Sequence, residues 1–201
     1  MLKKTILILI LFTCIFAKGQ NVDYIKEIKS FQDTLNKEFS TPEESPLTLV
    51  DQKTFEGLAY FPIDEKYRVE ASFIRTPNEK PFKMATTTSR KPIYIKYGEA
   101  HFTIDNKQVV LEIYQNQNLK LKKGYENYLF LPFTDETNGG ESYGGGRFID
   151  LRIPNDNMII IDFNKAYNPY CAYNYVYSCP KPPEENSIPL KINAGVKTYQ
   201  H

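Results

Sequence analysis

The side chains best suited to chemistry lie in the second half of the chain. Asp135 follows one β-rich run, Arg147 opens another, and Asp162 ends a third, with Asn164 close behind it. Carboxylates at strand ends beside an arginine can bind a ligand or form a buried ion-pair network. Two carboxylates can also act as general acid and base, if their environments differ. The sequence leaves all three interpretations open.

The chain order gives a specific expectation for Arg147. A turn at residues 154–157 is predicted to join the runs on either side of it as a hairpin. That pairing would place Arg147 opposite Asp162 or Asn164, and a guanidinium fork suits a carboxylate. We therefore expect a direct contact between them, with Asp135 near the same cluster.

A glycine-rich stretch separates Asp135 from Arg147. Half of the ten glycines occur here, at Gly139, Gly140, Gly144, Gly145 and Gly146. No Lys-Ser or Lys-Thr pair follows them and a strand comes next, so a phosphate-binding loop is not expected. A wide turn is the favoured interpretation. Residues 135–141 also resemble a calcium loop, but the match is poor because no glutamate stands at the twelfth position.

Five tyrosines crowd the eleven residues from 167 to 177 and alternate with asparagine and proline. Such a segment could form a wall on which a sugar stacks. A rigid cover, whose phenols hydrogen-bond to loop carbonyls, is the favoured interpretation.

Cys171 and Cys179 form an even pair if the chain is exported, so a disulfide is predicted. A free or catalytic thiol and a metal site are the alternatives. The chain has two histidines, His101 and His201, and no Gly-x-Ser-x-Gly motif. Too few histidines are therefore present to complete a zinc site, and a serine-hydrolase triad lacks its nucleophile motif.

The N-terminus predicts export. Residues 1–19 combine the basic Lys3 and Lys4, an apolar run and a small residue before the expected cleavage site, as in a secretory signal peptide. Acylation at Cys14 is the less favoured alternative, because Phe12 and Thr13 suit that signal poorly. The mature chain is then periplasmic or secreted, with no membrane span and one domain over residues 20–201.

The composition restricts the class of partner. The 201 residues include 25 basic and 24 acidic side chains, and signal removal leaves 22 of those bases. A nearly neutral chain offers no broad basic surface, so a nucleic-acid partner is not expected. The sequence also predicts no cofactor and no metal.

The elements that must position these residues are one helix followed by strands. Apolar residues recur every three or four positions over about 22–39, the period of an amphipathic helix. From residue 55 on, short β-rich runs alternate with turns: 57–61, 67–75, 82–88, 93–97, 101–104, 109–114, 128–133, 147–153 and 158–163. We expect a mainly β fold: an antiparallel β-sandwich or partly open barrel, one N-terminal amphipathic helix, and an irregular Tyr/Pro-rich C-terminal segment.

Several motifs give the mature chain a family resemblance. They are the stretches at 61–64, 133–137, 143–147, 162–173, 179–186 and 192–195. In these the chain resembles the DUF1684 family of bacterial and archaeal proteins, which implies no activity, cofactor or substrate. The resemblance matches the family's patterned polar residues to Asp135, Thr137, Tyr143, Arg147, Asp162, Asn164, Asn168 and Cys179. Ser142 stands where the family usually has Thr, and Val196 where it usually has Glu.

The favoured function is binding of a small polar ligand in a pocket lined by Asp, Arg, Asn and Tyr side chains. The predicted lining comprises Asp135, Thr137, Tyr143, Arg147, Asp162, Asn164, Tyr167 and Asn168. One alternative is a hydrolase that uses Asp135 and Asp162 as its carboxylate pair. The other is a purely structural role for the same residues.

Overall fold

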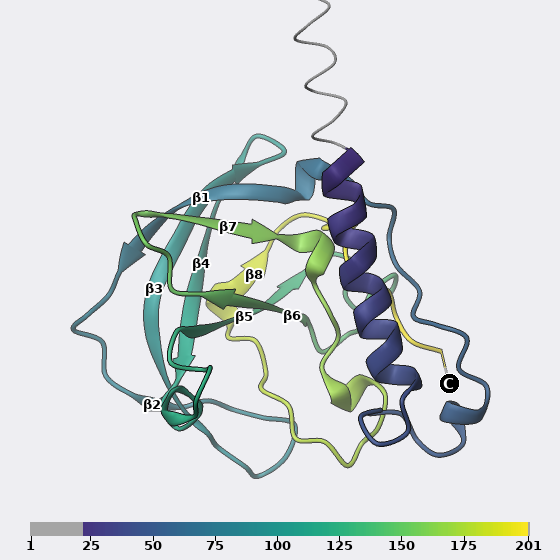
Figure 1. Cartoon of the computed structure of the whole chain (residues 1–201). Coiled ribbons are helices and arrows are strands. Elements are labelled where there is room, and N and C mark those ends of the chain that lie inside the picture. The colour runs from purple at the N-terminus through teal and green to yellow at the C-terminus, as the bar shows by residue number, and fades with distance from the viewer. Residues whose placement is uncertain (1–21, 201) are drawn as a thin grey trace, which may run out of the picture.

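A computed structural model describes residues 22–200 (Figure 1). The predicted signal peptide and Cys14 lie outside the described residues. A helix over residues 22–40 precedes the strands β1 (Arg68–Arg75), β2 (Phe82–Lys83), β3 (Ile93–Ile104), β4 (Lys107–Asn116), β5 (Tyr128–Asp135), β6 (Arg147–Arg152), β7 (Met158–Asp162) and β8 (Ser187–Ile188). Short 3-10 helices occur at Asp51–Lys53, Glu65–Tyr67, Leu119–Leu121, Phe163–Lys165, Tyr170–Ala172 and Glu184–Asn186.

The strands form one curled sheet, an open half-barrel, in the order β6-β5-β4-β3-β1-β7. Neighbours along this path are antiparallel, β2 adds to β3, and β8 pairs with β5 in parallel. The prediction of a mainly β, antiparallel fold with one N-terminal helix is confirmed, and the partly open barrel is the architecture formed.

The β3–β4 hairpin shows how local sequence sets the register. Its two turn residues, Asp105 and Asn106, both have positive φ, at 47° and 60°. This is the type I′ geometry that matches the twist of a hairpin and that Asp and Asn tolerate. The runs 93–97 and 101–104, predicted as two strands, are one strand with a register shift between Lys96 and Gly98.

The main core fills the inside of the curl. On β5 and β6 the inward residues, Leu129, Leu131, Ile149 and Leu151, belong to this core. On the other face Phe130 and Phe148 are buried under the tyrosine-rich segment at 167–180, whereas Asp150 is exposed. The outer face of this part of the sheet is therefore covered only in part.

The predicted hairpin between β6 and β7 is wrong. β7 pairs with β1 and β6 pairs with β5, so the two strands lie at opposite ends of the sheet order. The remaining edge of β6 is used by Tyr167, whose backbone exchanges two hydrogen bonds with Phe148. A later segment thus takes the edge that the hairpin would have used.

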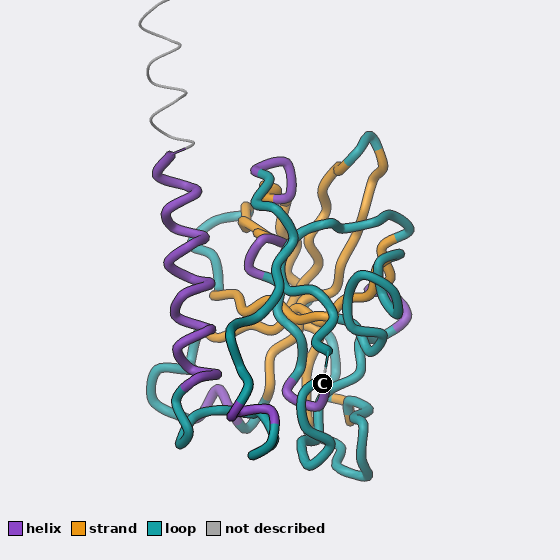
Figure 2. Tube along the Cα trace, turned by 90° about the vertical axis from the view of Figure 1, so that its right-hand side faces the viewer, coloured by secondary structure: helices purple, strands orange, loops and turns teal. Residues whose placement is uncertain are grey.

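The N-terminal helix packs alongside the sheet and the segment that follows β7 (Figures 1 and 2). Tyr24, Ile28 and Phe39 are its buried residues. Phe39 meets the Tyr173 ring edge-on, with centroids 4.7 Å apart. Within residues 22–200, no helix is both long enough and apolar enough to cross a membrane.

Candidate functional site

Arg147 lies in a buried polar cluster below the glycine-rich loop. Its side chain is fully buried, and Nη2 donates to Asp135 Oδ2 at 2.6 Å and to the Ile192 carbonyl at 2.9 Å. Nη1 donates to the Ala194 carbonyl. Burial lowers the pKa of the Arg147 guanidinium, and the adjacent Asp135 opposes that shift. The pair therefore holds the C-terminal segment against β5 and β6.

The second oxygen of Asp135 is occupied by backbone donors. Oδ1 accepts from the Thr137 and Ile192 N–H groups at 2.8 and 3.2 Å. Gly146 forms the bend before Arg147, with a φ of 87°. A Cβ atom at this position would lie only 2.7 Å from the Phe133 carbonyl oxygen, so the bend requires glycine. In the described part of the chain, no group of three or more His, Cys, Asp or Glu side chains is placed to hold a metal ion.

Asp162 and Asn164 form a different buried cluster. The Tyr24 hydroxyl donates to Asp162 at 3.0 and 3.1 Å, and Asn164 Nδ2 donates to that hydroxyl at 2.9 Å. Asn164 Nδ2 also donates to the Asp64 carbonyl at 2.9 Å. This cluster fastens the first turns of the N-terminal helix to the end of β7.

The predicted direct contact of Arg147 with Asp162 or Asn164 is therefore wrong, whereas its expected proximity to Asp135 is found. The error follows from the strand order, since β7 runs beside β1 and places Asp162 opposite Arg68. Asp135 and Asp162 each serve a separate buried cluster.

Cys171 and Cys179 are both free and buried, so the predicted disulfide is not formed in the structure. Hydrogen bonds satisfy the sulfurs instead: the Cys171 N–H donates to Cys179 Sγ at 3.2 Å. A hydrogen bond from the Cys179 thiol lowers the pKa of Cys171 below the usual range for a thiol. The half-buried Tyr143 places its hydroxyl 3.9 Å from Cys171 Sγ.

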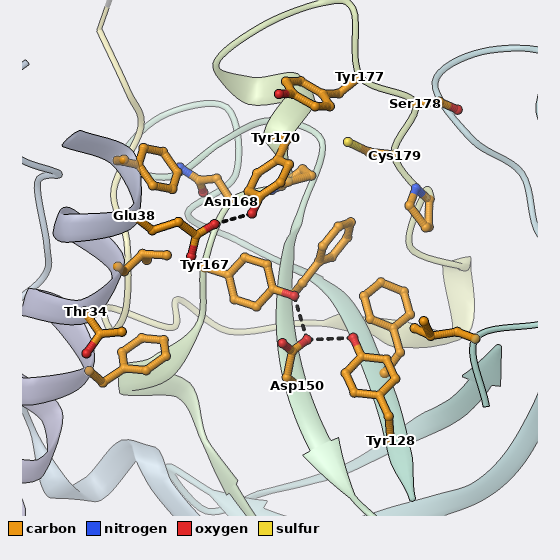
Figure 3. Close-up of a pocket in the computed structure, with 18 of the residues that line it drawn as sticks. Thr34, Glu38, Tyr128, Asp150, Tyr167, Asn168, Tyr170, Tyr177, Ser178 and Cys179 are labelled. Carbon is orange, nitrogen blue, oxygen red and sulfur yellow. Dashed lines mark hydrogen bonds between the residues drawn. The ribbon is translucent and has the colours of Figure 1, made fainter. Parts of the chain in front are cut away.

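A cavity of about 460 Å³ lies between the N-terminal helix, the outer face of β5 and β6, and the tyrosine-rich segment (Figure 3). The helix contributes one face, with side chains at positions 31, 34, 35, 38 and 39. Neither buried cluster contributes a residue to its lining. This cavity is the candidate functional site.

Strand alternation and an edge contact position the sheet side of the cavity. Phe130 pairs with Asp150 across β5 and β6, and Tyr128 and Phe148 flank them on the same face. The backbone bridge between Phe148 and Tyr167 then fixes the start of the tyrosine-rich segment beside β6. Residues from two strands and a distant segment thereby meet at Asp150.

Two carboxylates lie among these rings (Figure 3). The Tyr128 and Tyr167 hydroxyls both donate to Asp150 Oδ1, at 2.8 and 2.6 Å. The Tyr170 hydroxyl donates to Glu38 Oε1, across the gap between helix and segment. Burial raises the pKa of all three phenols, and the carboxylates raise it further. The phenols therefore remain protonated donors at neutral pH.

The cavity includes two of the eight residues predicted as binding residues, Tyr167 and Asn168. Glu38 and Asp150 line the cavity but are not among the residues predicted from the sequence. Glu38 does share the 3.6-residue stripe of Phe31 and Leu35, a signal of a common face. Asp150 alternates with buried apolar residues on β6, a pattern that ordinarily indicates a solvated side chain.

The sequence of the chain matches one known protein family. The family described as "Protein of unknown function (DUF1684)" matches residues 53–197. The chain belongs to the DUF1684 family. The match begins after the N-terminal helix, so Asp150 and the tyrosines of the cavity fall within the family region and Glu38 falls outside it.

A solved structure has the same fold. It is the solution NMR structure of the uncharacterized protein from gene locus rrnAC0354 of Haloarcula marismortui, with a TM-score of 0.70 and 32% identity. The similarity covers 90% of this chain and 97% of that one. No curated protein matches the chain.

Proposed function

We propose that this DUF1684 protein is an exported binding protein that holds a small organic molecule in the aromatic cavity. One observation carries the proposal: the cavity of about 460 Å³ joins aromatic walls to the carboxylates of Asp150 and Glu38. Binding sites for small molecules are concave, mostly apolar and furnished with a few oriented polar groups. Volumes of about 300–1,000 Å³ are typical of such sites.

The polar groups of the cavity are positioned before any ligand arrives. Asp150 is held by two phenol hydroxyls and Glu38 by one. A group that is already oriented loses little conformational entropy on binding, which favours affinity. This arrangement supports recognition better than a structural role, because the buried clusters of Arg147 and Asp162 already fasten the chain.

The hydrolase alternative has less support. Asp135 accepts a hydrogen bond from Arg147 in a fully buried ion pair, and Asp162 accepts one from the Tyr24 hydroxyl in a separate buried cluster. Acid–base hydrolysis of a glycoside needs two carboxyl groups that flank one substrate bond. The two aspartates serve different clusters and neither lines the cavity.

Blocking the cavity tests the proposal. Thr34 lines it from the exposed side of the helix, so Thr34→Trp is expected to fill its mouth without disturbing the core. We expect a thermal-shift screen of sugars, organic acids and amines to yield ligands of the wild-type chain. The Trp variant should bind each ligand at least about tenfold more weakly, a loss of about 1.4 kcal/mol.

Lys29→Trp is the matched control, since Lys29 is an exposed residue of the same helix outside the cavity. It should bind as the wild type does. Ligands that bind both Trp variants equally, or a screen without ligands, would contradict the proposal.

Export is a separate prediction. Expression of the full chain in a bacterial host should yield mature protein that begins near Gln20, as determined by intact-mass analysis of the periplasmic fraction. Material that retains Met1 would refute export, and an acylated Cys14 would establish the lipoprotein alternative.

A further inference from the structure

We propose that the ligand of the aromatic cavity is an organic ammonium cation with a compact, rounded head such as trimethylammonium. The inference rests on the proposed function and names the ligand class of that site. Three observations carry it: the charge of the lining, the open oxygen of Asp150, and the angles between the rings.

The charge of the lining is negative. Asp150 and Glu38 are its ionisable acids, and no Lys, Arg or His is among the lining residues. Within residues 22–200, no basic nitrogen lies within 4 Å of either carboxylate. Both carboxylates accept from neutral phenols, so no cationic side chain neutralises either of them at contact distance. A cation in the cavity would supply the missing counter-charge, whereas an anion would be repelled.

Asp150 keeps one oxygen for a ligand. The Tyr128 and Tyr167 hydroxyls share Oδ1, and Oδ2 has no hydrogen-bond donor in the described part of the chain. The shared contact fixes the carboxylate plane, and Asp150 remains exposed. A positive head group can therefore approach Oδ2 without breaking either hydrogen bond from the tyrosines to Oδ1.

The rings meet at steep angles and so surround a volume. Phe148 and Tyr167 are at 90° to each other, Phe130 and Phe148 at 73°, and Tyr170 and Tyr177 at 65°. Ring faces carry negative charge density, and a cation within about 6 Å of a face is attracted to it. Rings turned in several directions can contact a ligand from more than one side, as in the aromatic cages that bind quaternary ammonium groups.

The ring angles distinguish this ligand class from a sugar. A pyranose stacks flat on one aromatic ring, and its many hydroxyls need hydrogen-bond partners from the protein. A trimethylammonium head is rounded and has no N–H to donate. In this cavity the tyrosine hydroxyls at 128, 167 and 170 already donate to carboxylates. These hydroxyls are therefore already engaged, and Arg152 lies 5.5 Å from the Tyr128 ring centroid, so a ligand would contact the surface of the other rings.

Choline and its neutral isostere 3,3-dimethylbutan-1-ol provide the direct test, because they share a shape and differ in charge. We expect isothermal titration calorimetry to show that choline binds the wild-type chain at least about tenfold more tightly. Raising the ionic strength to about 1 M should weaken choline binding and leave the alcohol unaffected, since salt screens only the charged ligand.

Asp150→Asn and Glu38→Gln remove charge and keep an oxygen acceptor for the tyrosines. Each should weaken choline binding at least about fivefold, with little effect on the alcohol. Glu70→Gln is the control, because Glu70 is an exposed acid of β1 outside the cavity. It should change neither affinity.

The outcomes separate the two proposals. Equal affinities for choline and the alcohol, no choline binding at millimolar concentration, or tighter binding of glucose would overturn the cation inference. If Thr34→Trp still blocks the ligands that do bind, the proposed function stands while the ligand class is wrong. If that variant blocks nothing, the proposed function fails as well.

Discussion

Replacing Arg147 with alanine is expected to lower the free energy of unfolding by about 3–5 kcal/mol. Arg147 is fully buried and donates to Asp135 and to the carbonyls of Ile192 and Ala194. Its loss would leave a buried carboxylate without a counter-charge and two carbonyls without a donor. Urea denaturation followed by far-UV circular dichroism measures the change.

Arg152→Ala is the matched control for this prediction. Arg152 is an exposed residue at the other end of β6 whose guanidinium lies 5.5 Å from the Tyr128 ring centroid, so its loss should change the unfolding free energy by no more than about 1 kcal/mol. A cost for Arg147→Ala within that same limit would show that the ion pair does not hold the C-terminal segment.

Alkaline pH is expected to unfold the protein cooperatively. Burial is the largest cause of a raised pKa in Tyr24, Tyr94, Tyr114 and Tyr173, each of which is buried. A phenol whose pKa is higher in the folded state binds its proton more tightly there. Its contribution to stability is full below the unfolded pKa of about 10 and is lost as the pH rises through the folded pKa.

The size of this effect follows from linkage. A phenol that is protonated in the folded state and ionised in the unfolded state removes about 1.4 kcal/mol per pH unit. The phenols of Tyr24, Tyr114 and Tyr173, whose pKa is raised furthest among these four, together remove roughly 4 kcal/mol per pH unit above pH 10, a large share of the stability of an ordinary domain.

Spectrophotometric titration tests the alkaline prediction. Ionisation of the buried tyrosines, followed near 295 nm, should coincide with the loss of far-UV circular dichroism. Independent ionisation near pH 10 of all fifteen tyrosines, with the fold retained, would contradict it. Titration of the unfolded chain in urea supplies the reference.

Local pattern predicted most of the elements. The helix stripe, the alternation in β1 and the Asp105-Asn106 turn each carry their signal within a few residues. The order of the strands was harder to predict from the sequence, because the pairing of β1 with β7 joins residues about ninety positions apart in the chain. The hairpin expected between β6 and β7 failed for that reason, since Tyr167 occupies the edge of β6.

The candidate site was predictable only in part. The density of tyrosines after residue 167 marked one wall of the cavity, including Tyr167 and Asn168. Asp135 and Arg147 stood out by residue type, yet type alone does not separate a buried ion pair from a ligand site. Asp150 and Glu38 were missed because their distinction is spatial: tertiary packing brings a helix and a strand to opposite sides of one cavity.

We propose that the aromatic cavity, rather than either buried cluster, holds the ligand. The most direct measurement is a ¹H–¹⁵N correlation titration of the assigned mature protein with choline and with each ligand from the screen. Saturable shifts confined to the cavity walls are expected, at residues 34–39, 148–150 and 167–170. Shifts centred on residues 135–147 and 192–194, or spread without saturation over the surface, would contradict it.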